Sequence, residues 1–381
     1  MQEERKRILD LVEKGSISAQ EALVLLEALG NETGNTTGPT KQVEQPTHSN
    51  HSNKETHTKS STSSQADDFM EDIKRDFSQF GDRFMQLMQS AVGKMKSFDF
   101  DMPFGEPMEF HHTIHKEDVD FNNISADLAN GKLEIYPSQD GKLRAECHVK
   151  VYRSSSEEEG KREFHDKFVF VVDQQKLRII SDLKTTSVNI VLYIPKAKYD
   201  SISVRLFNGA FNGKHLETDR LKVKTANGKI ELKDCSIEDG EIQTANGAIL
   251  VKDARGNKID AETINGRIYI DGLLKNIEAQ SVNGHVALTT KNTEATKIEG
   301  LAVAGSVEIY VPSSVALQGE VSSNFGKMDV ALPDVTRLNE QEHFLQKNIR
   351  FTKDHEGSSA PLYIKGEAKT GSILVRYISA E

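Results

Sequence analysis

Histidine and acidic side chains near residue 111 are the first candidates for chemistry in this sequence. In the segment EFHHTIHKED, His111 and His115 would share one face of a strand, with Glu117 just beyond them. Imidazole and carboxylate groups are zinc ligands, so this pattern would suit a metal site. We nevertheless interpret these histidines as solvated surface residues, and we expect neither a metal ion nor a cofactor.

Acidic residues also recur at similar places in a repeating pattern. Asp234, Asp253 and Asp271 each follow a short alternating run, which would suit a calcium ladder or a row of sugar-binding groups. Asp is common in turns for conformational reasons, however, and the G-G-x-G-x-D calcium repeat is absent from the sequence. Phosphate-binding loops and the motifs G-x-S-x-G, H-E-x-x-H and C-x-x-C are absent as well. We therefore predict that the protein is not an enzyme.

The elements that would position these side chains are marked by repeated Asn-Gly pairs. Five of these pairs form a regular series, in which successive Asn positions are 19, 19, 19 and 18 residues apart. The pattern then weakens to Ala304-Gly305 and Phe325-Gly326, each 21 residues further on. A period of about 20 residues indicates a repeat architecture. The pairs are Asn208-Gly209, Asn227-Gly228, Asn246-Gly247, Asn265-Gly266 and Asn283-Gly284.

Two columns of apolar residues follow the Asn-Gly pairs. They stand three and five positions after each Asn or its replacement, and the residues between them are mostly polar or charged. Alternation with period two predicts strands that bury one face. The first column is Ile230, Ile249, Ile268, Val286, Val307 and Met328, and the second is Leu232, Val251, Ile270, Leu288, Ile309 and Val330.

Two architectures fit an Asn-Gly turn between alternating runs. A meander of β-hairpins is one, because Asn-Gly is a strong hairpin signal. A solenoid is the other, and only a solenoid places equivalent positions of successive repeats side by side. The matching columns favour a mainly β, β-helix-like stack of repeats about 19 residues long over residues 109–381, with no transverse helix within it. In this interpretation Asn-Gly is a structural corner with stacked Asn amides.

Residues 1–65 differ in composition from this block. Residues 1–30 read as a helical hairpin whose two helices end at Gly15 and Gly30, and which would serve in oligomerisation or docking. Residues 31–65 are almost devoid of apolar residues and are predicted to be a disordered linker. The linker histidines His48, His51 and His57 have no Cys or carboxylate cluster beside them, so no metal site is expected there.

An amphipathic helix is predicted at residues 66–98. Its apolar residues recur every three or four positions, which places them on one helical face. Three uses remain open: pairing with another helix in a coiled coil, docking on the β stack, or insertion at a membrane surface. We favour a protein partner or self-association through the N-terminal helices. The stripe is Phe69, Ile73, Phe77, Phe80, Phe84, Leu87, Ala91 and Met95.

Charge and cysteine content limit the partners and the compartment. The formal net charge of the 381-residue chain is −10, which disfavours binding to nucleic acid. The two cysteines, Cys147 and Cys235, make no disulfide framework and are expected to be small buried or edge thiols. No secretory signal or membrane span is evident. A cytoplasmic location is therefore expected, with peripheral membrane association or surface exposure by a route other than Sec left open.

Several segments resemble a known bacterial family. ILDLVEKGSISAQEALVLLEAL resembles the N-terminal helical hairpin of YvlB-like and LiaX-like proteins of Gram-positive bacteria. The segments VKTANGKIELKD, IQTANGAILVKD and IYVPSSVALQGEVSSNFGKMDV are similar to the bacterial putative-adhesin domain of unknown function, whose members repeat an N-G-x-I-x-V theme in a β-helix-like fold. The resemblance implies a place in the cell-envelope stress response of the Lia type, and it brings no catalytic residues.

Two classes of function follow from this reading. The first is a non-enzymatic scaffold or sensor, in which the β stack supplies a rigid surface and the helices bind a partner or membrane. The alternative is a carbohydrate-active β-helix enzyme or a glycan-binding adhesin acting on envelope polysaccharide. The enzyme would need carboxylates that converge on one face of the stack.

Overall fold

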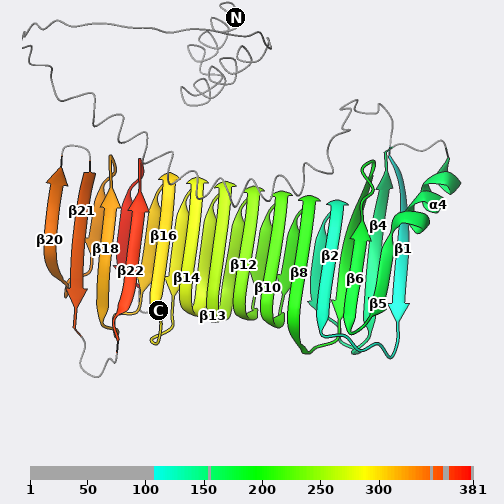
Figure 1. Ribbon diagram of the computed structural model, residues 1–381, viewed down its shortest axis with the longest axis horizontal. Helices are drawn as coiled ribbons and strands as arrows, with labels where there is room; N and C mark the ends of the chain where they lie inside the picture. Colours follow the sequence, from blue (N-terminus) through cyan, green and yellow to red (C-terminus); the bar gives the residue numbers. More distant parts are fainter. Residues whose placement is uncertain (1–106, 153–155, 344–345, 355–359, 379–381) are drawn as a thin grey trace, which may run out of the picture. The chain divides into compact units, whose positions relative to one another are not determined.

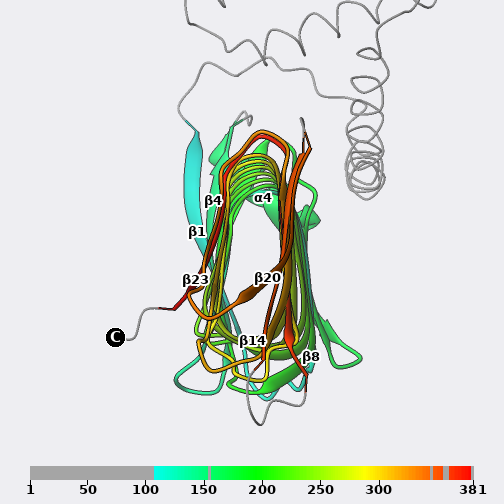
Figure 2. The ribbon, with the colours of Figure 1, turned by 90° about the vertical axis from the view of Figure 1, so that its left-hand side faces the viewer.

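The repeats fold into a stack of parallel strands, seen from the side in Figure 1 and end-on in Figure 2. This computed structural model describes residues 107–378 except 153–155, 344–345 and 355–359. The predicted hairpin at 1–30, linker at 31–65 and helix at 66–98 lie outside the described residues. The prediction of a mainly β solenoid is confirmed.

Each repeat contributes one rung, which consists of a long strand, a corner and a short strand, and the corner is Asn-Gly in the regular repeats. The long strands form one wall of the stack and the short strands form the facing wall, as Figure 2 shows. Strands β13 and β14 start in the short-strand wall and continue into the long-strand wall. The long-strand wall contains β6 (Lys176–Ser181), β2 (Asn123–Asn130), β8 (Lys198–Asn208), β10 (Glu217–Asn227), β12 (Ser236–Asn246), β13 (Ile249–Asn265), β14 (Ile268–Asn283), β16 (Lys297–Ala304), β22 (Leu362–Ala368) and β18 (Leu317–Ser323). The short-strand wall contains β7 (Thr186–Ile194), β3 (Leu133–Pro137), β9 (Phe211–Lys214), β11 (Ile230–Lys233), β15 (Val286–Thr290), β17 (Val307–Val311), β23 (Ile373–Tyr377) and β19 (Met328–Ala331).

The register of the rungs distinguishes a solenoid from a meander. Strands β10, β12 and β13 run parallel, and Thr244 lies opposite both Thr225 and Thr263. In the other wall, Ile249 lies opposite Ile230 and Ile268. Equivalent residues therefore stack on one another, as the columns predicted.

The two apolar columns line the space between the walls. Ten of their side chains are at most 1 % exposed, from Ile230 and Leu232 through to Val307 and Ile309. Val330 is 5 % exposed and Met328 is only half-buried. Both belong to β19, which pairs only with β23 and so forms the edge of its wall.

The order of rungs in space departs from chain order at both ends of the stack. The β2–β3 rung lies between the β6–β7 and β8–β9 rungs, although it precedes both in sequence. The C-terminal β22–β23 rung lies between the β16–β17 and β18–β19 rungs. The chain therefore inserts its last described rung into the stack instead of adding it at the end.

Antiparallel strands extend the walls at their ends. Strand β4 pairs with β7 and then with β1, while β5 pairs with β6. At the other end β21 pairs with β18 and then with β20. Phe351 of β21 is fully buried, and its ring lies where a side chain at Gly319 would otherwise stand. The bounds are β1 (Met108–Lys116), β4 (Leu143–Val151), β5 (Val169–Asp173), β20 (Thr336–His343) and β21 (Gln346–Lys353).

A helix within the β block corrects the expectation that none would occur there. Helix α4 (Glu157–Lys167) lies at the β1 end of the stack in Figure 1, where Phe164 is 1 % exposed and packs edge-on against Phe110. The sequence does carry a signal for the start of this helix, a serine followed by three glutamates in the first turn. In the structure the Ser156 hydroxyl caps the helix by accepting a hydrogen bond from the Glu159 amide at 3.2 Å. Its single buried aromatic residue gives almost no apolar stripe, which is why periodicity missed it.

Candidate functional site

The Asn-Gly pairs lie at the corner that joins the two walls, where their side chains form a continuous amide ladder. Each Asn Nδ2 donates to the Asn Oδ1 of the preceding rung, so every inner amide is held on both sides. The ladder starts at Asn130, which the sequence analysis did not include although it too precedes a glycine. The bonds run from Asn208 to Asn130 (3.0 Å), Asn227 to Asn208 (2.9 Å), Asn246 to Asn227 (2.9 Å), Asn265 to Asn246 (2.8 Å) and Asn283 to Asn265 (2.9 Å).

Buried hydroxyl groups fix the same corner from inside. The Thr244 hydroxyl donates to the carbonyl oxygen of Gly228 at 3.0 Å, and Thr263 makes the equivalent bond to Gly247 at 3.1 Å. Both threonines are at most 3 % exposed, so these bonds satisfy polar groups that water does not reach. The corner is therefore held by side-chain hydrogen bonds on both its outer and inner sides.

Removing one amide should weaken the ladder measurably. Asn246→Ala deletes the bonds to Asn227 and Asn265, and we expect a loss of about 1 kcal/mol because both bonds are exposed to water. Chemical denaturation of the full chain measures this loss. Lys229→Ala, at an exposed position next to the same corner, should change stability by less than about 0.5 kcal/mol. Equal stability of wild type and Asn246→Ala would show that the ladder does not stabilise the stack.

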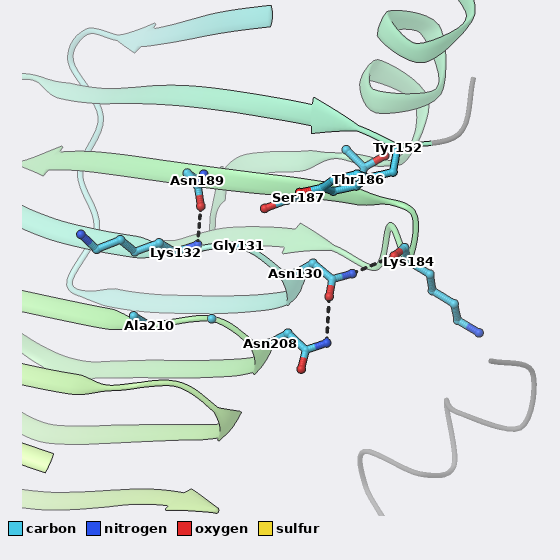
Figure 3. A pocket seen from close by; sticks show the side chains of 11 residues that line it. Asn130, Gly131, Lys132, Tyr152, Lys184, Thr186, Ser187, Asn189, Asn208 and Ala210 are labelled. Carbon is cyan, nitrogen blue, oxygen red and sulfur yellow. Dashed lines mark hydrogen bonds between the residues drawn. The ribbon is translucent and has the colours of Figure 1, made fainter. Parts of the chain in front are cut away.

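The ladder ends in a hollow of about 400 Å³ beside β7, shown in Figure 3. Asn130 Nδ2 donates to the carbonyl oxygens of Leu183 (3.2 Å) and Lys184 (2.9 Å), and Asn189 Oδ1 accepts from the Lys132 amide at 2.9 Å. The lining offers amide, hydroxyl and ammonium groups together with the exposed ring of Tyr152. Groups of these kinds suit a hydroxylated ligand such as a sugar.

The outer face of the short-strand wall carries a second arrangement of polar residues. Lys214, Lys233 and Lys252 occupy equivalent positions on three adjacent parallel strands, so Lys233 has a lysine on either side. Tyr136 and Tyr193 lie opposite each other on β3 and β7, with ring centroids 6.2 Å apart. The wall thus presents aromatic and cationic groups on neighbouring strands.

Hydrogen bonds hold the tyrosine end of this face in place. The Tyr136 hydroxyl donates to the Glu134 carboxylate, which raises the pKa of Tyr136 to about 12 and keeps the phenol protonated at neutral pH. Glu134 also pairs with Lys132 at 2.6 Å. The guanidinium of Arg144 lies over the Tyr193 ring at 4.3 Å and pairs with Glu146 at 3.3 Å. These side chains are oriented by their neighbours and do not swing freely.

The histidine and acid candidates of the sequence do not assemble a site. His111 stacks on His148 with centroids 4.6 Å apart, while the Glu117 carboxylate pairs with Lys142. Over residues 107–378, apart from the gaps in the description, no group of three His, Cys, Asp or Glu could hold a metal ion.

The repeated aspartates have conformational and electrostatic roles in the described structure. Asp234 and Asp253 occupy left-handed corners with φ of 53° and 52°, and Asp271 pairs with Lys291 at 2.9 Å. They do not form a row of free carboxylates, because Asp234 faces His215 at 3.9 Å and Lys291 lies within 4.0 Å of both Asp253 and Asp271.

Both cysteines are buried free thiols. Burial raises the pKa of Cys147 to about 12 and also raises the pKa of Cys235. Protonated thiols are poor nucleophiles, so neither side chain is set up for covalent chemistry.

The predicted partner or membrane stripe lies outside the described residues; it comprises Phe69, Ile73, Phe77, Phe80, Phe84 and Leu87. Among the described helices, none combines the length and the apolar character needed to cross a bilayer.

Two family profiles match this chain, one over the β stack and one near the N-terminus. The profile of the Toastrack DUF4097 family matches residues 121–357, and that of a SHOCT-like domain matches residues 3–34. YvlB, an uncharacterized protein of Bacillus subtilis (strain 168), is 38% identical over 377 residues, which cover 99% of both chains. The resemblance to YvlB-like proteins read from the sequence is confirmed.

Two solved structures are among those to which this chain shows similarity. A protein of Bacteroides fragilis described as a putative adhesin is 13% identical, with a TM-score of 0.35, and the match covers 71% of this chain and 99% of that chain. A protein of Parabacteroides distasonis described as a putative lipid binding protein is also 13% identical, with a TM-score of 0.34, and the match covers 73% of this chain and 98% of that chain.

Proposed function

The chain belongs to the Toastrack DUF4097 family, and from this premise we propose that it is a non-enzymatic scaffold or sensor of the bacterial cell envelope. In this proposal the β stack is a rigid binding surface, and the N-terminal helices attach it to a protein partner or to a membrane. The link to envelope stress is supported by the sequence resemblance to LiaX-like proteins.

The observation that carries the proposal is the corner of the stack. Hydrogen bonds of 2.8 to 3.0 Å connect the side-chain amides of six Asn residues on successive rungs. Buried threonine hydroxyls donate hydrogen bonds to the glycine carbonyl oxygens beneath them. Side chains on the walls therefore keep fixed spacings across many rungs. A surface with fixed spacings binds an extended partner without first losing conformational entropy.

The hollow beside β7 favours glycan binding as a second candidate function. Its amide, hydroxyl and aromatic groups are those that recognise sugars, and Asn189 and Asn130 are already oriented by their backbone partners. An enzymatic role has less support, because several glutamates of the long-strand wall form ion pairs with lysines. Glu241 pairs with Lys222 at 2.5 Å, and Glu299 pairs with Lys297 at 2.7 Å.

The predicted helix at 66–98 provides the test of attachment. We expect the full chain to self-associate, and Phe77→Ser, Phe80→Ser and Phe84→Ser together to abolish this, because apolar area on the stripe drives helix pairing. Analytical ultracentrifugation over a range of concentrations measures the mass. Phe100→Ser and Phe104→Ser together remove aromatic rings beyond the predicted helix and should leave association unchanged.

Flotation of the same variants with phosphatidylglycerol vesicles separates the two modes of attachment. A wild-type chain that stays monomeric but floats with vesicles, and loses flotation in the stripe variant, would make a membrane the partner. A chain that neither self-associates nor floats with vesicles would contradict attachment through these helices to a second copy of the chain or to a membrane.

A further inference from the structure

Lys214, Lys233 and Lys252 form a lysine row on the short-strand wall, and repulsion between their charges destabilises the isolated protein. Adjacent strands lie about 4.8 Å apart, and like charges directly opposite each other destabilise a sheet. Lys233 and Lys252 are exposed and Lys214 is partly exposed. None of the three forms an ion pair in the part of the chain that the structure describes.

The carboxylates around the row are already engaged with other cations. Glu231 pairs with Lys229 at 2.5 Å. Asp234 faces His215 at 3.9 Å, and Asp271 pairs with Lys291 at 2.9 Å. The pKa of Glu231 is lowered by its hydrogen bond to Lys229 and, less strongly, by the charge of Lys252. The positive charge of the row is therefore compensated only in part, within a chain of net charge −10.

The opposite wall of the same protein shows how other lysines are accommodated. There Lys222 and Lys224 both pair with Glu241, and Lys258 and Lys297 both pair with Glu278 at 3.2 Å. Each of these two carboxylates is shared by two lysines, so these lysines lie beside a carboxylate. The row on the short-strand wall departs from this arrangement, which calls for an external anion.

Toward β4 the register extends the row into a longer line without carboxylates, while at the other end of the row β14 carries Asp271 one residue after the partner of Val251. Continuing the pairing of β3 with β9 by one residue places Tyr136 opposite Lys214. Tyr136 in turn lies opposite Tyr193, and Tyr193 lies opposite Arg144 of β4. Six neighbouring strands thus carry, in order, an arginine, two tyrosines and three lysines.

Acidic residues border this line, which makes it narrow. Glu134 and Glu231 lie on the same face, two residues before Tyr136 and Lys233. Asp234, at the corner, comes directly after Lys233. A planar anionic surface would meet these acids as well as the lysines, whereas a single extended chain would meet only the line.

We propose that this line binds a linear anionic glycan, a sugar polymer that carries carboxylate, phosphate or sulfate groups along its length. The ammonium groups of Lys214, Lys233 and Lys252 bind successive anionic groups of the polymer. Sugar rings pack against Tyr136 and against the side of the Tyr193 ring that the Arg144 guanidinium does not cover, because the apolar faces and polar hydroxyls of tyrosine suit an amphipathic ring. The inference rests on the proposed function of the β stack as a binding surface, and it names the partner of one wall.

Binding of polymers by the full chain tests the proposal. We expect polygalacturonate and dextran sulfate to bind in a salt-sensitive manner and neutral dextran not to bind, as measured by calorimetry. Lys214→Gln, Lys233→Gln and Lys252→Gln together should weaken binding by about tenfold or more. The control Lys116→Gln, Lys196→Gln and Lys327→Gln removes the same charge from scattered exposed positions and should change binding by no more than about twofold.

The same variants separate a ligand site from a structural role. Because the row repels itself, the row variant should unfold at a higher temperature than wild type at low salt, and the difference should shrink as salt is added. Weaker binding together with higher stability supports the proposal. Equal weakening by the row and control variants would overturn it, since binding would then follow net charge alone.

Two further outcomes would also overturn the proposal. One is failure of the wild-type chain to bind either anionic polymer. The other is binding to phosphatidylglycerol vesicles that depends on the row while polymer binding does not, which would assign the row to a membrane. If the chain still associates through its helices in either case, the proposed scaffold function stands and only this inference fails.

Discussion

Replacing Ile249 by Asp is expected to unfold the β stack, whereas Lys252→Asp on the same strand should leave it folded. Ile249 has no exposed surface and stacks between Ile230 and Ile268. A carboxylate there would lose its hydration without gaining a partner, which costs about 3–5 kcal/mol in addition to the lost apolar contact. The sum is comparable to the total stability of a typical domain, about 5–15 kcal/mol.

Thermal and urea unfolding of the full chain, followed by circular dichroism, measure this difference. Val251→Asp should behave like Ile249→Asp, because Val251 is equally buried two residues along the strand. Lys252→Asp exchanges an exposed side chain and should shift stability by less than about 0.5 kcal/mol. If Ile249→Asp and Lys252→Asp unfolded at the same temperature, the inward and outward assignment of this strand would be wrong.

The interior of the stack was predictable because one physical rule repeats in every rung. A buried position must be apolar, so the columns beginning at Ile230 and Leu232 reveal the inward face with no knowledge of the pairing. The constant spacing of the Asn-Gly pairs then implies that like stacks on like. Only Met328 departs, since β19 has one neighbour instead of two.

The order of the rungs was not predictable from the same columns. Ile373 and Val375 fit next to Val307 and Ile309 as well as they would fit at the end of the stack, because every rung presents equivalent residues. A repeating pattern identifies which residues face inward but does not identify which rung is the neighbour. The inserted positions of β2–β3 and β22–β23 follow from loop connections that carry no such signal.

The candidate binding line was visible in part. Lys214, Lys233 and Lys252 are 19 residues apart and each follows the second inward position of its rung, so their alignment could have been read from the sequence. The absence of ion pairs at these three lysines among the described residues could not have been read from the sequence. Whether a lysine is paired depends on corner residues such as Asp234, whose direction is set by a left-handed backbone conformation.

Gly247→Ala should also destabilise the stack strongly, for a reason that hydropathy does not show. A Cβ atom at Gly247 would lie 2.0 Å from the carbonyl oxygen of Gly228 and 2.5 Å from its carbon, far inside the ordinary contact range of 3.4–4 Å. The φ angle of Gly247 is not in the left-handed region, so the close approach of two rungs is the whole effect. Its neighbour is backbone, held by the bond from the Gly228 amide to the Asn246 carbonyl at 2.9 Å.

Because the backbone cannot rotate away as a side chain can, relief requires the two rungs to separate at the corner. We expect a loss of about 3 kcal/mol or more. Gly300→Ala is the matched control: the added methyl would meet side-chain methyls of Val307 at 2.9 Å and Leu288 at 3.2 Å, which can shift. Its loss should be about 1 kcal/mol. Both substitutions reduce the entropy of the unfolded chain alike, so their difference in urea unfolding isolates the backbone contact, and equal losses would contradict it.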